Sequence, residues 1–247
     1  MQTSRWNWLA WLALAVALGA IGLLALSGPG YRMGWFALGT ALVQMLTWAA
    51  YAGIAAGGLA LLALLVIGRR GNNGARLAAL LALIVGLASV GVPYRLQRQA
   101  QAVPAIHDIS TDTLTPPLFV EAEAVRLDAQ APNALDYSAG VAAQQRAGYP
   151  DLKPAFLTAS ADEAYAKALG LVRARGWEMV ADDEAGRRIE ATATTSWFGF
   201  KDDVAIRVSV IPDGTSRVDV RSVSRIGRSD VGTNARRIRA FLADLAK

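Results

Sequence analysis

The stretch RIEATATTSWFGFKDDVAIRVSVIPDGTSRVDVRSV, residues 188–223, decides the fold of the second half of this chain. Within it, three segments alternate between apolar and polar residues, with the apolar positions at 189, 191, 193, 204, 206, 208, 218 and 220. Alternation with a period of two is typical of a strand that buries one face. Short connections, including the turn Pro212-Asp213-Gly214, join the segments. We therefore expect neighbouring antiparallel strands of one sheet.

The segments on either side supply two helices and two further strands. Residues 155–158 and 177–181 read as strands. Ser160 begins a helix, with Glu163 three residues later as in a capping box, and Gly176 is a natural stop. Residues 231–245 carry the apolar stripe of a second helix. The sequence thus predicts an α+β fold, in which an antiparallel sheet of about four to five strands has two helices packed on one face.

The opposite face of this sheet is polar in the sequence. Its residues are Arg188, Glu190, Arg207, Arg217, Asp219 and Arg221. Antiparallel sheets commonly leave one face in water, so we expect a solvated, ion-paired surface. The alternative is a binding face for an anionic or polar ligand.

The first hundred residues have a different composition. They contain seven arginines and no acidic residue, whereas all 20 acidic residues and the other 18 basic residues follow. Apolar runs at about 8–26, 35–67 and 77–92 carry no charge, and Pro93 ends the third. Runs of this kind cross a bilayer as helices. We predict a three-helix transmembrane anchor at 1–100, an extended linker or wrap at 101–150, and the α+β core at 151–247.

The charges between the runs give the anchor an orientation. The turn from Arg69 to Arg76 holds three arginines, whereas the first loop carries only Arg32. The positive-inside rule places the turn and the N-terminus in the cytoplasm, although Arg95 and Arg98 argue mildly against this. The predicted location is a bacterial inner membrane, multi-pass, with the C-terminal domain in the periplasm. Cleavage after the first run, at the small-residue site Ala25-Leu26-Ser27, is an alternative that leaves this orientation unchanged.

Several classes of function are disfavoured. No Asp, Glu, Lys or His lies inside an apolar run, which argues against a transporter or channel. The basic excess flanks the membrane runs and lacks a basic-aromatic patch, so nucleic acid is not an expected partner. There is no cysteine, Walker loop, G-x-G-x-x-G or zinc spacing, and we expect no cofactor. In the second run, Gly53 and Gly57 form a G-x-x-x-G match, which favours close helix packing within the chain.

Catalytic candidates are few. His107, the only histidine, stands beside Asp108 and near Asp112, a combination that suits a base or a metal site. A lone histidine on a turn-rich linker more often caps a turn, and we treat these three as weak catalytic candidates.

Two loops are the main candidates for binding or interaction. The first carries Trp197, Phe198 and Phe200 followed by Lys201, Asp202 and Asp203. The aromatic side chains either plug the end of the sheet core, dip into a membrane surface or seat a partner. The second loop carries Arg225, Arg228 and Asp230. We expect its arginines to pair with Asp202, Asp203 or Asp230, and Ser229 or Asp230 to cap the last helix.

These loops and the linker resemble a bacterial family, domain of unknown function 1499. The matching stretches are His107 to Asp112 with Pro116-Pro117, Tyr149-Pro150-Asp151, Arg188 to Asp203 and Ser222 to Phe241, so the resemblance spans residues 104–247. It implies a membrane-linked or exported domain and no established activity, and it carries no catalytic residues.

The leading hypothesis is a non-enzymatic, membrane-tethered extracytoplasmic domain. It would bind a partner as an accessory or assembly factor of an envelope membrane complex, with the lipid bilayer and another membrane protein as its partners. The alternatives are a hydrolase-like or metal-dependent enzyme using His107, and a lipid-binding module.

Overall fold

The computed structural model of the chain describes residues 6–68, 72–212 and 214–247. These residues form two units. The first comprises Met1–Arg98 with Trp197–Gly199, and the second comprises Gln99–Ser196 with Phe200–Lys247.

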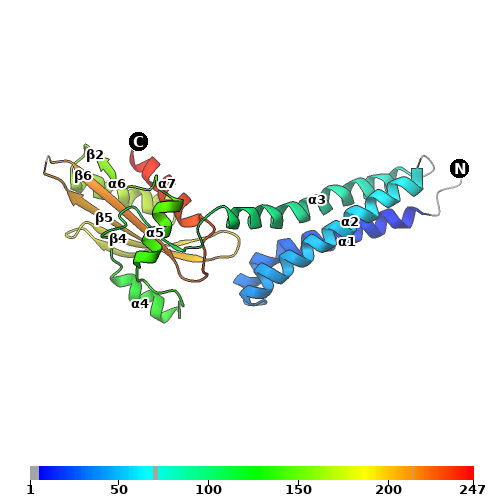
Figure 1. Cartoon of the computed structure of the whole chain (residues 1–247), viewed down its shortest axis with the longest axis horizontal. Coiled ribbons are helices and arrows are strands. Elements are labelled where there is room, and N and C mark those ends of the chain that lie inside the picture. Colours follow the sequence, from blue (N-terminus) through cyan, green and yellow to red (C-terminus); the bar gives the residue numbers. More distant parts are fainter. Residues whose placement is uncertain (1–5, 69–71, 213) are drawn as a thin grey trace. The chain divides into compact units, whose positions relative to one another are not determined.

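The first unit is helical. It contains α1 (Asn7–Arg32), the π-helical segment η1 (Thr40–Gln44), α2 (Met45–Ile67) and α3 (Asn73–Gln101) (Figure 1). As hydropathy predicted, three helices are long and apolar enough to cross a membrane. Helix α1 continues through Pro29 and α3 through Pro93, beyond the ends that the sequence indicated. A proline removes one backbone donor, and membrane helices tolerate that loss where neighbouring groups compensate.

The basic turn lies partly outside the described residues, because 69–71 are not among them. At its end, the Asn72 side chain accepts a hydrogen bond from the amide of Ala75 at 2.7 Å and so caps the start of α3. The Arg76 guanidinium donates to the carbonyl of Gly68 at 2.7 Å.

Small residues bring the helices of this unit together. Alanines from all three helices form a buried cluster: Ala13, Ala17, Ala56, Ala60 and Ala82. At Gly53 an added Cβ would lie 2.7 Å from the carbonyl oxygen of Gly86 in α3, and the reverse distance is also 2.7 Å. The G-x-x-x-G match therefore serves packing within the chain, as predicted.

The second unit is an α+β fold, which confirms the predicted class. Its elements are β1 (Asp108–Ser110), α4 (Glu121–Asp128), α5 (Ala139–Gly148), β2 (Ala155–Leu157), α6 (Ala161–Ala174), β3 (Glu178–Asp183), β4 (Arg188–Thr194), β5 (Lys201–Val210), β6 (Ser216–Ser224) and α7 (Thr233–Leu245). Among the described residues, five strands form an antiparallel sheet in the order β1-β6-β5-β4-β3, and β2 is the sixth strand of the same sheet. The short strand β2 also pairs with β6, at Ser216 to Val218, whereas β1 pairs with Arg221 to Val223.

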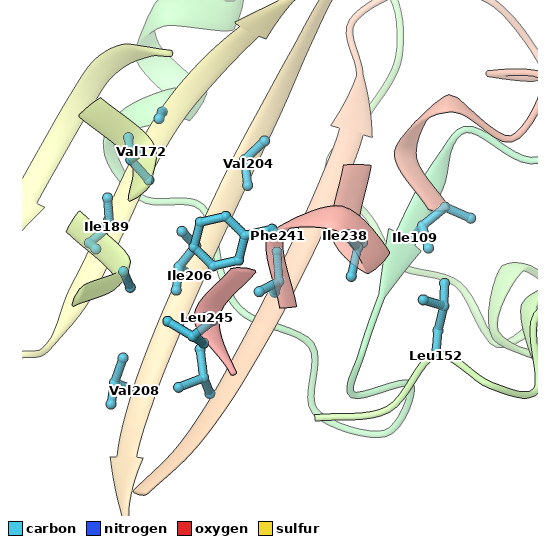
Figure 2. Close-up of a cluster of buried hydrophobic side chains, with 14 of the residues drawn as sticks. Ile109, Leu152, Val172, Ile189, Val204, Ile206, Val208, Ile238, Phe241 and Leu245 are labelled. Carbon is cyan, nitrogen blue, oxygen red and sulfur yellow. The ribbon is translucent and has the colours of Figure 1, made fainter. Parts of the chain in front are cut away.

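Helices α6 and α7 cover one face of the sheet, as the two-period pattern predicted. Phe241, Ile238 and Leu245 of α7 pack over Ile206 and its neighbours on β5 (Figure 2). The expected capping box begins α6: the Ser160 hydroxyl accepts from the Glu163 amide, and the Glu163 carboxylate accepts from the Ser160 amide. Gly176, just after α6, has a φ of +65°, which suits its predicted role as a stop.

The region from 101 to 150 has more structure than the predicted wrap. Asp108–Ser110, within the predicted linker, pairs with β6 as strand β1. Two helices, α4 and α5, also lie within the region that was predicted as an extended linker or wrap. Gln145 of α5 fixes β1 in place, since its side chain accepts from the Ser110 amide at 2.8 Å and donates to the Ser110 carbonyl at 2.5 Å. The Gln145 side chain thus satisfies backbone groups at the sheet edge that a neighbouring strand would otherwise satisfy.

Candidate functional site

Most of the polar face of the sheet is covered, so the prediction of a solvated surface is wrong there, whereas Arg188, Arg207 and Arg217 stay about one third exposed and ion-paired as predicted. Residues 111–137, including α4, lie over it, and Figure 1 shows α4 on the side of the sheet away from α7. Glu190, Asp203 and Asp219 have no exposed surface, and Arg221 is 2% exposed. We call the charged residues between sheet and covering segment the ionic layer: Asp108, Asp112, Arg126, Glu190, Asp203, Arg207, Arg217, Asp219, Arg221 and Arg225.

Asp203 lies at the centre of one half of the ionic layer. Its carboxylate accepts hydrogen bonds from Arg126 at 2.6 Å, from Arg225 at 2.8 Å and from the Thr192 hydroxyl at 2.8 Å. Burial opposes ionisation, but these hydrogen bonds outweigh it and hold the pKa of Asp203 below its usual range. The predicted pairing of Arg225 with Asp203 is confirmed, and Arg126 of α4 completes the cluster.

Arg221 lies at the centre of the other half of the ionic layer. It makes two hydrogen bonds to Asp108, at 2.7 and 3.0 Å, and donates to the carbonyls of Pro117 and Leu135. Its guanidinium also lies 5.1 Å from the centre of the Phe119 ring. One buried cation therefore fixes three separate points of the covering segment through its planar array of donors.

Asp112 joins the covering segment to the far end of β5 and β6. Its carboxylate accepts from Arg217 at 2.7 Å and from Arg207 at 3.2 Å, and it also caps the turn formed by Leu114 and Thr115. Burial raises the pKa of Asp112, but the turn hydrogen bonds and the Arg217 charge prevail and bring it to about 2. At neutral pH this group is an anion held by two arginines.

Glu190 of β4 anchors the start of α4. Its two carboxylate oxygens accept from the backbone amides of Val120 and Ala122 at 2.9 and 2.8 Å. The N-terminus of a helix carries unsatisfied amide groups and a partial positive charge. A buried carboxylate from the sheet therefore replaces a local cap, which the helix lacks.

The three catalytic candidates are engaged with other partners. Asp108 is bound to Arg221, and Asp112 to Arg207 and Arg217. The half-buried His107 ring has Nδ1 3.5 Å from the carbonyl of Arg228, across the sheet end. Among the residues that the structure describes, no group of three His, Asp or Glu side chains is arranged to hold a metal ion.

The two candidate loops follow the strands of the sheet. Asp202 and Asp203 point to opposite faces, as neighbouring strand residues must: Asp202 pairs with Arg237 of α7 at 2.6 Å, and Asp203 with α4. Gly232 is the N-cap residue of α7, and Asp230, two residues earlier, satisfies the start of the helix by accepting from the amides of Gly232 and Asn234.

The aromatic loop holds Trp197, Phe198 and Phe200. Among the described residues of the second unit, the main buried core does not include these three side chains. Trp197 is half exposed, and Phe198 and Phe200 are partly buried. Thr195 closes the loop, since its amide donates to the Phe200 carbonyl and its hydroxyl accepts from the Phe200 amide. Lys201 pairs with Glu178 on the surface at 3.2 Å.

Comparison with known proteins identifies the region that contains the ionic layer. Residues 108–245 match the family described as Protein of unknown function (DUF1499). The chain belongs to the DUF1499 family. The matched region begins at β1 and ends at the last residue of α7, so it holds the whole sheet, its covering segment and both packed helices. No curated protein matches the chain.

The covering segment of this DUF1499 region exposes several leucines, although Phe119 and Ala122 are buried against Ala205 and Val223. It buries Arg126, which is 4% exposed, and turns Leu114, Leu118 and Leu127 outward with 87%, 69% and 73% of their surface exposed. The sequence interpretation missed Arg126. The available signal was its spacing of four from Ala122, which places both on the buried face of α4.

Proposed function

We propose that this DUF1499 protein is a membrane-tethered binding module, an accessory or assembly factor that docks a second protein of the envelope through its covering segment. The single observation that carries the proposal is the exposure of Leu114, Leu118 and Leu127 on the covering segment. Exposed leucines stabilise nothing in the isolated domain, whereas apolar side chains at an interface are protected from water when a partner binds.

A protein suits this surface better than a lipid bilayer. Glu121, Glu123 and Asp128 lie among the exposed leucines, while the one basic residue of α4, Arg126, is buried against Asp203. Surfaces that insert into anionic membranes normally carry exposed Lys or Arg beside their apolar residues. The acidic flank favours a partner that offers basic side chains around an apolar centre.

Site-specific photo-crosslinking in native membranes tests the proposal. A crosslinking residue at Leu127 should capture a discrete protein, and the variant Leu118→Ser with Leu114→Ser should abolish that product without lowering the unfolding midpoint. The control position is Val210, which is 58% exposed but lies outside the covering segment. Identical products at both positions would refute the proposal, and products containing only lipid would replace it with the lipid-binding alternative.

The proposal also places the domain outside the cytoplasm. Its support is the arginine-rich turn from Arg69 to Arg76 between the second and third apolar helices. Because the chain lacks cysteine, single introduced cysteines report topology cleanly. We expect Asp128→Cys to react with an impermeant maleimide in intact spheroplasts, and Asn73→Cys to react only after permeabilisation. The reverse pattern would place the domain in the cytoplasm.

A further inference from the structure

A cleft lies beside α5 in the second unit, and its lining includes Thr111 and Gln145, the residue that fixes β1. Its volume is about 370 Å³, and its lining includes Thr113, Arg146, Tyr149, Pro150, Leu152 and Lys153. This size falls at the lower end of the range of roughly 300–1,000 Å³ that small-molecule sites occupy.

The walls of the cleft are fixed by hydrogen bonds to the sheet. Gln145 binds both the amide and the carbonyl of Ser110, and the Tyr137 hydroxyl donates to the Gln145 side chain at 2.8 Å. On the other side, the Thr111 hydroxyl accepts from the amide of Val220 at 2.9 Å. These hydrogen bonds hold the backbone and the buried wall of the cleft in place, so ordering the wall costs little entropy when a ligand binds.

Two cations line this cleft without an acidic partner. Most arginines of the second unit form ion pairs, but within residues 99–212 and 214–247 none is found for Arg146 or Lys153. The nearby carboxylate of Asp112 is already bound by Arg207 and Arg217. The cleft therefore keeps a positive charge, although residues after 100 carry 20 acidic against 18 basic side chains.

The helix dipole explains the position of only one of these two cations, Arg146. Arg146 lies in the last turn of α5, where the helix dipole favours a cation. Lys153 lies beyond the helix, four residues after Tyr149, and the dipole gives no reason for its place in the same cleft.

We propose that this cleft binds an anionic phosphate group carried by a small organic molecule, either a soluble phosphomonoester or a phospholipid headgroup. The guanidinium of Arg146 offers a planar fork to two phosphate oxygens, and Lys153 adds a compact charge. The Thr113 hydroxyl, 3.4 Å from Arg146 Nη1, can donate to a third oxygen. Leu152 and Pro150 give an apolar wall for the organic part. The inference goes beyond the proposed partner docking and does not depend on it.

Binding measurements on the full chain in a phosphate-free maltoside detergent test the inference. One arm titrates glycerol 3-phosphate by calorimetry, with glycerol as its blank. The other adds phosphatidylglycerol, with diacylglycerol as its blank, and counts retained lipid by native mass spectrometry. Binding in the first arm alone identifies a soluble phosphomonoester, and binding in the second identifies a lipid headgroup.

The variant Arg146→Gln with Lys153→Gln should weaken the observed binding at least tenfold. Both side chains are exposed, so the unfolding midpoint should not change. Lys167→Gln is the matched control, because Lys167 is another exposed cation of this unit that does not line the cleft. The inference is overturned if neither phosphate probe binds the wild-type chain. It is also overturned if the probe that binds the wild-type chain binds the double variant with the same affinity. The leucine variants should bind phosphate normally, which separates this result from the docking test.

Discussion

Replacing Asp203 with alanine should destabilise the DUF1499 domain far more than a typical ion-pair deletion. The carboxylate has no exposed surface and lies between the guanidinium groups of Arg126 and Arg225. Without it, two cations stay buried with no anion between them, and the Thr192 hydroxyl loses its acceptor. Removing one partner of a buried pair costs about 3–5 kcal/mol.

That loss is large against the total stability of a domain, which is about 5–15 kcal/mol. In a domain of this size it lowers the melting temperature by about 10 °C, since each kcal/mol shifts it by about 2–4 °C. Urea unfolding of the full chain in detergent, followed by hydrogen exchange of β5 and β6 peptides, measures the change. This readout separates the sheet from the three apolar helices.

The control is Asp162→Ala, because the contact of Asp162 with Arg187 has nearly the same length. The nitrogen–oxygen distance is 2.7 Å between Arg187 and Asp162 and 2.6 Å between Arg126 and Asp203. Asp162, however, is 81% exposed. We expect a loss of about 0–1 kcal/mol there. Equal losses in the two variants would refute the reasoning, since burial would then not decide the energy.

A triple apolar replacement gives a second check. If uncompensated charge is the cause, Arg126→Met, Asp203→Leu and Arg225→Met together should recover most of the stability lost in Asp203→Ala. Well-packed apolar groups often replace buried ion pairs at little cost. A triple variant as unstable as the single one would contradict this explanation.

Three further predictions concern other parts of the molecule. Gly53→Val should loosen the helical unit and lower its detergent unfolding temperature, because its Cβ meets the Gly86 carbonyl oxygen at 2.7 Å; Gly58→Val, with nothing within 4 Å, should have little effect. The pKa of Asp112, near 2 in the fold, lies below its ordinary value, so its ionised form stabilises the fold. That contribution, about 2 kcal/mol, should be complete above about pH 4 and disappear as the pH falls towards 2; acid titration of the unfolding free energy should show this loss in the wild type and not in Asp112→Asn. Ser160→Ala should cost about 1 kcal/mol in urea unfolding through loss of the helix cap, and an unchanged midpoint would contradict that role.

Local features of the candidate site were predictable from sequence. The pairing of Arg225 with Asp203 and the role of Asp230 at the start of α7 follow from short loops that bring few charges together. Arg126 was not predictable in the same way. It lies 77 residues from Asp203, in a segment whose short helix gives no sign of which sheet residue it meets.

By itself, the sequence determined the three apolar helices and the strands and helices of residues 155–245, but it did not identify β1, α4 or α5. Period-two alternation, helix caps and uncharged apolar runs act over a few residues, so they identify these strands, helices and long apolar helices without reference to the rest of the chain. Only the tertiary structure decided that most of the polar sheet face is covered. The alternating pattern shows that one face of the sheet is polar. It does not show whether water or charged residues from distant parts of the chain bind the polar groups of that face. Here Asp108 binds Arg221 across 113 residues, and that pairing turns an apparent surface into a second, ionic core.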